Sequence, residues 1–242
     1  MTRVFFTACS NRCSGKVICP VGCHGEAWQS IPDEAPALRW RPPQQPPADI
    51  QRLEGSRLKI VLMRHGQPDV DRRARLNAAQ FGDWVKAYDV AGIDTASRPS
   101  QAAIDLAAEC AITVCSNLAR SQESARLLGA RRIVAADRLF REMEMPHAAW
   151  RFPRIGLSLW LVFFRLAWLM GYAGDIESFK AARRRAHTCA ERLAAMAASD
   201  GGVLFVGHGS LNWFIARRLK KMGWQSSDAS PRRYWEFAVF HR

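Results

Sequence analysis

Two apolar runs in this sequence end in the same pair of residues. The first, "LKIVLMRHG", spans residues 58–66, and the second, "GVLFVGHG", spans residues 202–209. Short runs rich in Val, Ile and Leu are typical of buried strands. A strand interior excludes an unpaired Arg or His because burying such a group is costly. The end of a strand that faces a cleft accepts these side chains, so we expect both His-Gly pairs beside a ligand site.

Helical and strand-like segments alternate along most of the chain. Helical periodicity covers residues 76–90, 99–111, 117–129, 176–199 and 210–223. Strand-like runs cover residues 58–63, 112–116, 132–136, 202–207 and 233–242. This alternation predicts an α/β fold with a mostly parallel central sheet covered by helices on both faces. An apolar segment near 152–173 interrupts the pattern, and we expect it to form a helical cap insert.

Residues 1–57 differ from the rest of the chain. Residues 31–50, "IPDEAPALRWRPPQQPPADI", are rich in Pro and Gln and favour extended conformations that bury little surface. Four cysteines and a histidine precede them at spacings that differ from the usual zinc motifs: Cys9, Cys13, Cys19, Cys23 and His24. We therefore expect a Cys-containing, poorly ordered extension without a metal, followed by one domain over 58–242.

The chain carries a net charge of +13, of which residues 1–57 contribute +2 and the remainder +11. A strongly basic domain favours an anionic partner, namely a phosphorylated metabolite, a nucleic acid or an acidic membrane surface. The same excess is also typical of arginines that are simply solvated. No convincing signal peptide opens the sequence, because the apolar run "VFFTAC" is far too short for one, which favours a cytoplasmic location.

A third segment brings a further cation to the predicted site. "VCSNLARSQESA" places Arg120 one turn into a helix that follows a predicted strand. Ligands of open α/β sheets bind beyond the carboxyl ends of the strands, so Arg64, Arg120, His65 and His208 are expected to share one crevice. Guanidinium groups suit a tetrahedral oxyanion because each can donate two hydrogen bonds to it. The residues themselves therefore predict a phosphate site and favour a phosphorylated small molecule over nucleic acid as the partner.

These motifs resemble the histidine phosphatase superfamily, also called phosphoglycerate mutase-like. The resemblance covers Arg64-His65-Gly66, the Ser116-x-Leu118-x-Arg120 segment and Gly207-His208-Gly209. It implies that His65 is a nucleophile that forms a phosphohistidine without metal or cofactor. It also implies that Arg64, Arg120 and His208 bind the phosphate oxygens, together with the backbone at Gly66 and Gly209.

The resemblance further implies a carboxylic acid that protonates the leaving oxygen. "DRLFREMEMP" offers Glu142 and Glu144, and we favour Glu142 because it follows Leu139 by three residues. Many mutases of the family carry an Asn shortly after Arg-His-Gly, whereas this chain has Gln67, which could bind phosphate instead. This departure and the short domain favour a phosphatase over a mutase. A non-catalytic phosphate-binding protein at an anionic membrane is the remaining alternative.

The insert, "RFPRIGLSLWLVFFRLAWLMGYAG", is apolar but carries Arg165 near its centre. A charge in that position disfavours a transmembrane helix. Phenylalanine and tryptophan on nearly all faces predict a helix buried against its own domain or a dimer partner. A hydrophobic wall for a lipid-like substrate and a membrane-surface contact stay open. We expect Arg165 to lie on a polar side of this helix or to pair with a carboxylate.

Overall fold

A five-stranded sheet organises the part of the chain that the structure, a computed structural model, describes: residues 58–130 and 132–242. Its strand order is β4-β3-β6-β1-β7. The strands are β1 (Lys59–Arg64), β3 (Ile112–Cys115), β4 (Ile133–Ala136), β6 (Gly202–Gly207) and β7 (Phe237–His241). The first four are parallel, and β7 is antiparallel to β1 at the edge. The predicted mostly parallel sheet is confirmed. The cysteine cluster and the Pro-rich segment lie outside the described residues.

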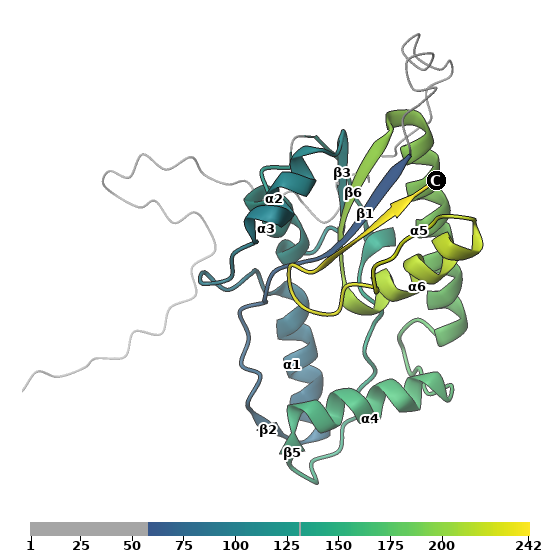
Figure 1. The fold of residues 1–242 in the computed structure, drawn as a ribbon. Helices are drawn as coiled ribbons and strands as arrows, with labels where there is room; N and C mark the ends of the chain where they lie inside the picture. The colour runs from purple at the N-terminus through teal and green to yellow at the C-terminus, as the bar shows by residue number, and fades with distance from the viewer. Residues whose placement is uncertain (1–57, 131) are drawn as a thin grey trace, which may run out of the picture. The chain divides into compact units, whose positions relative to one another are not determined.

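Helices cover both faces of this sheet (Figure 1). Side chains alternate along β1, so that Ile60 and Leu62 pack on one face while Val61 and Met63 pack on the other. The first face meets α5 (Phe179–Asp200) and α6 (Gly209–Lys221), and the second meets α2 (Gln101–Ala108) and α3 (Ala119–Leu127). Continuous apolar runs in β1 and β6 are therefore explained by burial on two sides.

A separate group of elements lies beyond one end of the sheet (Figure 1). It comprises α1 (Ala78–Val90), α4 (Leu157–Leu169) and the short antiparallel pair β2 (Arg75–Leu76) and β5 (Ile155–Gly156). A third apolar cluster holds them together: Ala78, Phe81, Leu157, Trp160 and Phe164. This cap, with the 3-10 turn η2 (Arg138–Phe140) that precedes it, stands over the strand ends.

Side-chain caps set several helix boundaries inside the predicted ranges. Asn77 and Gln80 form a reciprocal capping box, so α1 begins at Ala78 and not at residue 76. Ser178 accepts a hydrogen bond from the Ala181 amide and starts α5 three residues later than the periodicity indicated. The last strand is also shorter than predicted, because the carboxylate of Glu236 binds the amides of Arg232 and Arg233 in a turn.

The α4 helix corrects the expectation that apolar residues on all faces would be buried. One stripe packs on the domain, namely Leu157, Trp160, Phe164 and Trp168, while the opposite side is exposed. Arg165 pairs with no carboxylate of the described residues: its guanidinium donates to the backbone carbonyls of Glu144 and Met143 at 3.2 and 3.3 Å and lies 4.9 Å from the Trp168 ring. None of the described helices is long and apolar enough to cross a membrane.

Phe164→Ala should destabilise the protein more than any change on the outer side of α4. Phe164 is fully buried and stacks on Phe81 at 5.2 Å and on Trp160 at 5.4 Å. Truncating such a ring lowers the free energy of unfolding by about 3–5 kcal/mol, whereas an exposed substitution stays within about 0.5 kcal/mol. Urea unfolding of Phe164→Ala beside Leu166→Ala measures this difference, and equal losses would contradict the packing of α4.

Candidate active site

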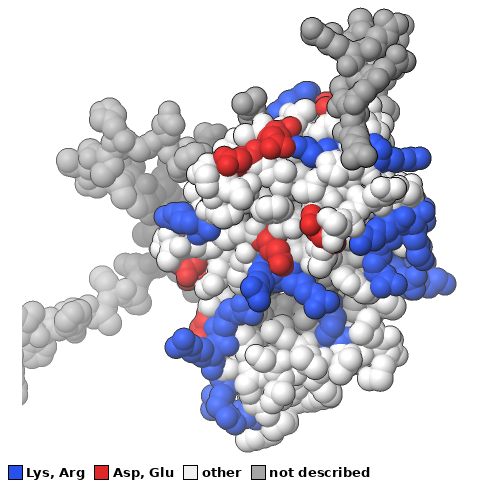
Figure 2. Space-filling model, viewed as in Figure 1, with Lys and Arg blue, Asp and Glu red and all other residues white. Residues whose placement is uncertain are grey.

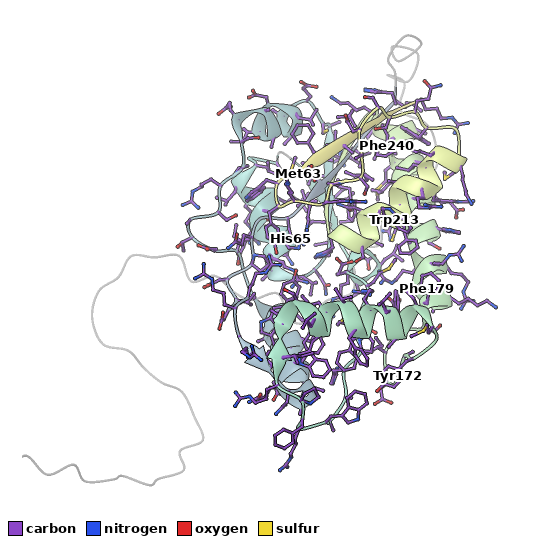
Figure 3. The ribbon with its side chains drawn as sticks, turned by 60° about the horizontal axis from the view of Figure 1, so that its bottom comes forward. Met63, His65, Tyr172, Phe179, Trp213 and Phe240 are labelled. Carbon is purple, nitrogen blue, oxygen red and sulfur yellow. The ribbon has the colours of Figure 1, made fainter. Side chains whose placement is uncertain are left out.

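The pairing of β1 with β6 brings the two His-Gly motifs together. Arg64 lies opposite Gly207 in the parallel register, and the His65 amide donates to the Gly207 carbonyl at 3.0 Å. The rings of His65 and His208 consequently lie 5.0 Å apart, and both are almost completely buried. His65 lies between the end of β1 and the cap helix α4 (Figure 3). Both imidazoles therefore reach one site at the carboxyl ends of the strands, as predicted.

Two guanidinium groups join these imidazoles. Arg120 comes from the first turn of α3, is 0% exposed, and donates to the Tyr88 carbonyl at 2.6 Å. Its nearest carboxylate is that of Asp89, at 3.7 Å from Nη2. Arg64 ends β1, donates to the Arg232 carbonyl and lies 4.4 Å from the Tyr234 ring centre. Two cations thus belong to the site, and a partly exposed carboxylate lies beside Arg120.

Several buried nitrogen atoms of this group lack a hydrogen-bond partner among the described residues. They are Nε of Arg64, Nε and Nη2 of Arg120, and Nδ1 of His208. A buried polar atom without a partner is costly, and such atoms in a native structure require an explanation. An oxyanion would accept hydrogen bonds from all of them. The cluster is therefore an anion-binding site by its chemistry.

The hydrogen bond of His65 defines which of its nitrogens can react. Nδ1 lies 2.7 Å from the Gly66 carbonyl oxygen, which can only accept, so Nδ1 carries the proton in the neutral ring. The lone pair then belongs to Nε2. Burial, and next the Arg120 guanidinium, hold the pKa of His65 well below its usual value of 6.5. A neutral imidazole with a free Nε2 lone pair is a nucleophile at neutral pH.

His208 is held from its other side. Its Nε2 lies 2.8 Å from the Ser116 hydroxyl, which also accepts from the Leu118 amide at 3.4 Å. The hydroxyl can therefore donate its proton to Nε2, which leaves the ring proton on Nδ1, the unpartnered atom. Burial, followed by the charges of His65 and Arg120, lowers the pKa of His208 well below 6.5. His208 is thus oriented as a neutral hydrogen-bond donor.

Three further buried polar residues hold these motifs in place, and two of them, Ser124 and Asn212, were not singled out from the sequence. Ser124 accepts from the Gly66 amide at 2.8 Å and donates to the Arg120 carbonyl at 2.6 Å, which joins the first motif to the second. Ser121 donates to the Val206 carbonyl at 2.6 Å. Asn212 donates to the Met63 carbonyl at 3.0 Å. Ser124 lies one turn after Arg120, so its position could have been found from helical spacing.

Tyr234 is the residue that no local pattern could have indicated. It belongs to the loop before β7, yet its ring lies 5.8 Å from that of His65. Its hydroxyl accepts from Arg72 at 2.7 Å, so the aromatic ring covers Arg64 and His65 while its polar end is tied to a second loop. Tyr234 therefore packs beside both Arg64 and His65.

A cavity of about 420 Å³ opens beside this cluster between the strand ends and the cap. Its walls combine basic and acidic groups with apolar side chains: Arg64, Arg72, Arg138, Arg141, Arg165, Arg185, Asp89, Glu142, Glu144, Glu177, Trp84, Val85, Leu118, Met143, Met145, Leu161, Tyr88 and Tyr234. This volume falls in the range of small-molecule sites.

Both candidate acids line this cavity. The Glu142 carboxylate accepts from the Leu211 and Ser210 amides at 3.0 and 3.2 Å and so occupies the amino terminus of α6, where the helix dipole favours a negative charge. The Glu144 carboxylate accepts from the Glu177 amide at 2.7 Å. Position in the cavity alone does not decide which of the two is the acid. Of the two, Glu142 is the one whose carboxylate contacts α6, the helix that begins directly after His208.

The remaining predicted residues differ in their placement. A Cβ atom on Gly66 would come 2.4 Å from the Trp235 ring, and one on Gly209 would come 3.4 Å from the Arg64 guanidinium, so both glycines allow close packing within the site. Gln67 does not join the cluster. Its side chain is exposed and its amide donates to Ser97, so its predicted phosphate contact stays a prediction.

The cysteines of the described residues do not form part of this site. Cys110, Cys115 and Cys189 are buried and free, and burial raises the pKa of Cys115 to about 12, which keeps it a thiol. No group of three or more potential metal ligands occurs within 58–130 and 132–242.

Two buried imidazoles and two guanidinium groups thus lie at the strand ends of a mostly parallel α/β sheet, a set of side chains that suits a tetrahedral anion. Residues 60–234 match the histidine phosphatase superfamily (branch 1). Because this match spans well over half of the 242 residues, the chain belongs to the histidine phosphatase superfamily. The predicted resemblance is confirmed. No curated protein matches the sequence.

Solved structures give similar but distant matches. A mycobacterial glucosyl-3-phosphoglycerate phosphatase is 22% identical, with 68% of this chain and 80% of that chain covered and a TM-score of 0.46. YhfR of Bacillus stearothermophilus is 18% identical, with 75% and 89% covered and a TM-score of 0.48. The alpha-ribazole phosphatase of Shigella flexneri is 21% identical, with 66% and 78% covered and a TM-score of 0.38. The family assignment therefore depends on the match over 60–234.

Stability should fall on the acid side because both histidines are buried in neutral form. Below pH 6.5 the unfolded chain takes up protons at His65 and His208 that the folded chain, with both pKa values lowered, does not. The free energy of unfolding then decreases by up to about 1.4 kcal/mol per pH unit for each histidine. Urea denaturation at pH values from about 7 to about 5, the usual titration range of His, gives the free energy of unfolding at each pH. In a His65→Gln/His208→Gln double variant this free energy should fall less steeply with decreasing pH. Parallel curves would contradict the burial of neutral rings.

Proposed function

We propose that this protein is a phosphomonoesterase that hydrolyses a small or lipid-like phosphate ester through a phosphohistidine on His65. The observation that carries the proposal is the set of unpartnered nitrogen atoms of Arg64, Arg120 and His208 around the His65 ring. These groups would bind the three oxygens of a phosphoryl group and stabilise its charge in the transition state. Metal-free catalysis follows from the same donors, because guanidinium groups can neutralise the charge that a magnesium ion would.

The first chemical step is attack by His65 on phosphorus. The Nε2 lone pair forms a bond to phosphorus while the bond from phosphorus to the ester oxygen breaks. The Nδ1 proton, held by the Gly66 carbonyl at 2.7 Å, stabilises the positive charge that develops on the ring. The alcohol portion leaves with the electron pair of the broken bond, and it needs a proton because an alkoxide is a poor leaving group.

Glu142 supplies that proton and later removes one from water. In the second step, the deprotonated carboxylate accepts a proton from a water molecule whose oxygen attacks phosphorus. The bond between Nε2 and phosphorus then breaks, and inorganic phosphate and neutral His65 are released. Glu142 is favoured over Glu144 because its carboxylate contacts the first turn of α6, directly after His208.

Phosphoglycerate mutase-type transfer is the second candidate function. A mutase returns the phosphoryl group to a second substrate hydroxyl, whereas a phosphatase gives it to water. The mutase hypothesis is weaker for two reasons. Many mutases carry an Asn shortly after Arg-His-Gly, whereas this chain has Gln67 in that region, and the Gln67 side chain is exposed. A phosphate-binding protein without turnover is weaker still, because the candidate nucleophile His65 and the donor set lie beside a cavity whose walls include both candidate acids, Glu142 and Glu144.

The cavity favours a substrate with both a charged and an apolar part. The cavity lining combines the guanidinium groups of Arg64 and Arg72 with the apolar side chains of Trp84, Leu118 and Leu161. A phosphate ester with an apolar or aromatic body would use both kinds of wall, which supports the lipid-like class without naming a compound. The cytoplasmic location, which the sequence favoured, stays a prediction. The homodimer, which the sequence left open, stays a prediction as well.

Replacing His65 should abolish turnover. His65→Ala should lower kcat on an aryl phosphate by at least about 10⁴-fold, since no other group can take the phosphoryl group. Rapid acid-free quenching of the native enzyme should trap phosphate on His65 by mass spectrometry, and excess chelator should leave the rate unchanged. Substantial activity in His65→Ala, or loss of activity with chelator, would refute the metal-free phosphohistidine mechanism.

The assignment of the acid is tested by varying the leaving group. Glu142→Gln should slow alkyl phosphates by about 10²–10⁴-fold but p-nitrophenyl phosphate far less, because only a basic leaving oxygen needs a proton. Glu144→Gln is the matched control at the same cavity and should affect both substrates alike. The reverse pattern would assign the acid to Glu144.

A further inference from the structure

Exposed apolar side chains gather in one part of the described structure. Of thirteen large hydrophobic residues exposed in the described chain, nine lie within 150–172. They are Trp150, Phe152, Leu159, Val162, Phe163, Leu166, Leu169, Met170 and Tyr172, and together they are called the α4 face below. Phe152 is 81% and Met170 83% exposed. A contiguous apolar surface of this size marks an interaction site.

Five of the nine residues of the α4 face belong to the helix α4 itself, which has no polar side. Among Leu157–Leu169 only Ser158 and Arg165 are polar, and Arg165 turns to the backbone carbonyls of Glu144 and Met143. At 100° per residue, Leu159, Val162 and Leu166 point away from the buried stripe of Trp160, Phe164 and Trp168. Figure 3 shows α4 across the front of the molecule, with Tyr172 beyond its end. Contact with water alone therefore does not explain why the outer side of α4 carries apolar side chains.

Positive charge borders the amino-terminal end of the α4 face. Arg151 and Arg154 are exposed in the loop before β5, and the pairing of β2 with β5 adds Arg75, which donates to the Arg154 carbonyl at 3.3 Å. No Asp or Glu occurs between Glu144 and Asp175 in the sequence. In Figure 2 the surface at the bottom of the view, where Figure 1 places α4, is white and has blue side chains at its border. The apolar surface is thus edged by cations.

A basic groove runs along the other flank of α4. This cavity of about 520 Å³ lies between α4, α5 and α6, and Leu169 belongs both to its wall and to the α4 face. Its walls contain five cations and four aromatic rings and no acidic residue: Arg165, Arg183, Arg217, Arg218, Lys221, Trp168, Phe179, Trp213 and Phe214. Arg218 is paired with Glu191 outside the lining, at 2.7 Å. Phe179 and Trp213 lie behind α4 in Figure 3. A groove of this composition accommodates anionic groups.

We propose that the α4 face, with the arginines at its amino-terminal border and the basic groove on its flank, docks on the surface of an anionic lipid bilayer. The apolar and aromatic side chains would enter the boundary between headgroups and acyl chains, and the cations would contact anionic headgroups. A helix of 13 residues is about 20 Å long, short of the roughly 30 Å hydrocarbon core, so α4 lies along the surface. This inference is independent of the proposed phosphatase activity.

Charge distinguishes a bilayer from a second copy of the chain as the occupant. In a two-fold symmetric dimer the α4 face meets its own copy, so both partners bring the cations of Arg151 and Arg154 and neither brings an Asp or Glu from residues 145–174 to pair with them. Like charges in such an interface are unfavourable, whereas anionic headgroups neutralise them. The composition therefore favours lipid.

The test is sedimentation of the full chain with vesicles of phosphatidylcholine, with and without about 30% phosphatidylglycerol, at low and high salt. Binding should require phosphatidylglycerol and weaken as salt is raised. Val162→Glu/Leu166→Glu should weaken binding at least about tenfold, since two carboxylates would have to enter the interface. Arg151→Gln/Arg154→Gln should weaken binding to the anionic vesicles as well. The matched control is Val90→Glu/Leu127→Glu, which places the same charges at exposed apolar positions outside the α4 face.

Neither Val162 nor Leu166 lines the cavity at the active site, so Val162→Glu/Leu166→Glu should keep the melting temperature and the aryl-phosphate rate of the native protein. Equal binding by this variant and the control would overturn the proposal, as would equal binding to both kinds of vesicle. A dimer in sedimentation velocity that Val162→Glu/Leu166→Glu dissociates, without vesicle binding by the native chain, would assign the α4 face to a second copy and overturn it too.

Discussion

The site depends on the parallel hydrogen bonding of β1 to β6. These two strands are central in the sheet, and their register sets Arg64 against Gly207. The backbone therefore leaves β1 and β6 at the same level along the sheet. His65 and His208 consequently lie side by side although 142 residues lie between them in the sequence. A shift of one residue would turn every β1 side chain to the opposite face of the sheet. Core packing on both faces prevents that shift and so also fixes the distance between the two imidazoles.

Electrostatics in the site are unbalanced without an anion. Two guanidinium groups and two buried imidazoles lie together at the strand ends, and among the described residues the carboxylate of Asp89 pairs with one of them, at 3.7 Å from Arg120. The imidazoles respond by staying neutral, since burial and the neighbouring guanidinium groups lower both pKa values. The guanidinium groups cannot respond in that way because arginine does not lose its proton in proteins. A phosphoryl group supplies the missing negative charge and the missing hydrogen-bond acceptors together.

Local sequence patterns predicted most of the fold and the two His-Gly pairs and two arginines of the site. The apolar strands, the His-Gly pairs and the helix with Arg120 follow from patterns within ten or so residues, and the structure places them together. Helix ends were less accurate because side chains such as Ser178, and not periodicity, decide them. Tyr234 and the cavity walls could not be predicted, since they arise where loops distant in sequence meet. The outer side of α4 was also unpredictable, because apolar composition alone does not tell a buried helix from one with a single packed stripe.

Arg165 ties the surface of the protein to its interior. It belongs to α4, it lies in the walls of both cavities, and it holds the carbonyl groups of Met143 and Glu144, directly after Glu142. Any tilt or rotation of α4 must therefore either break these two hydrogen bonds or carry the acid-bearing loop along with the helix. A contact that displaces α4 from outside would therefore also displace the loop that carries Glu142, the proposed acid.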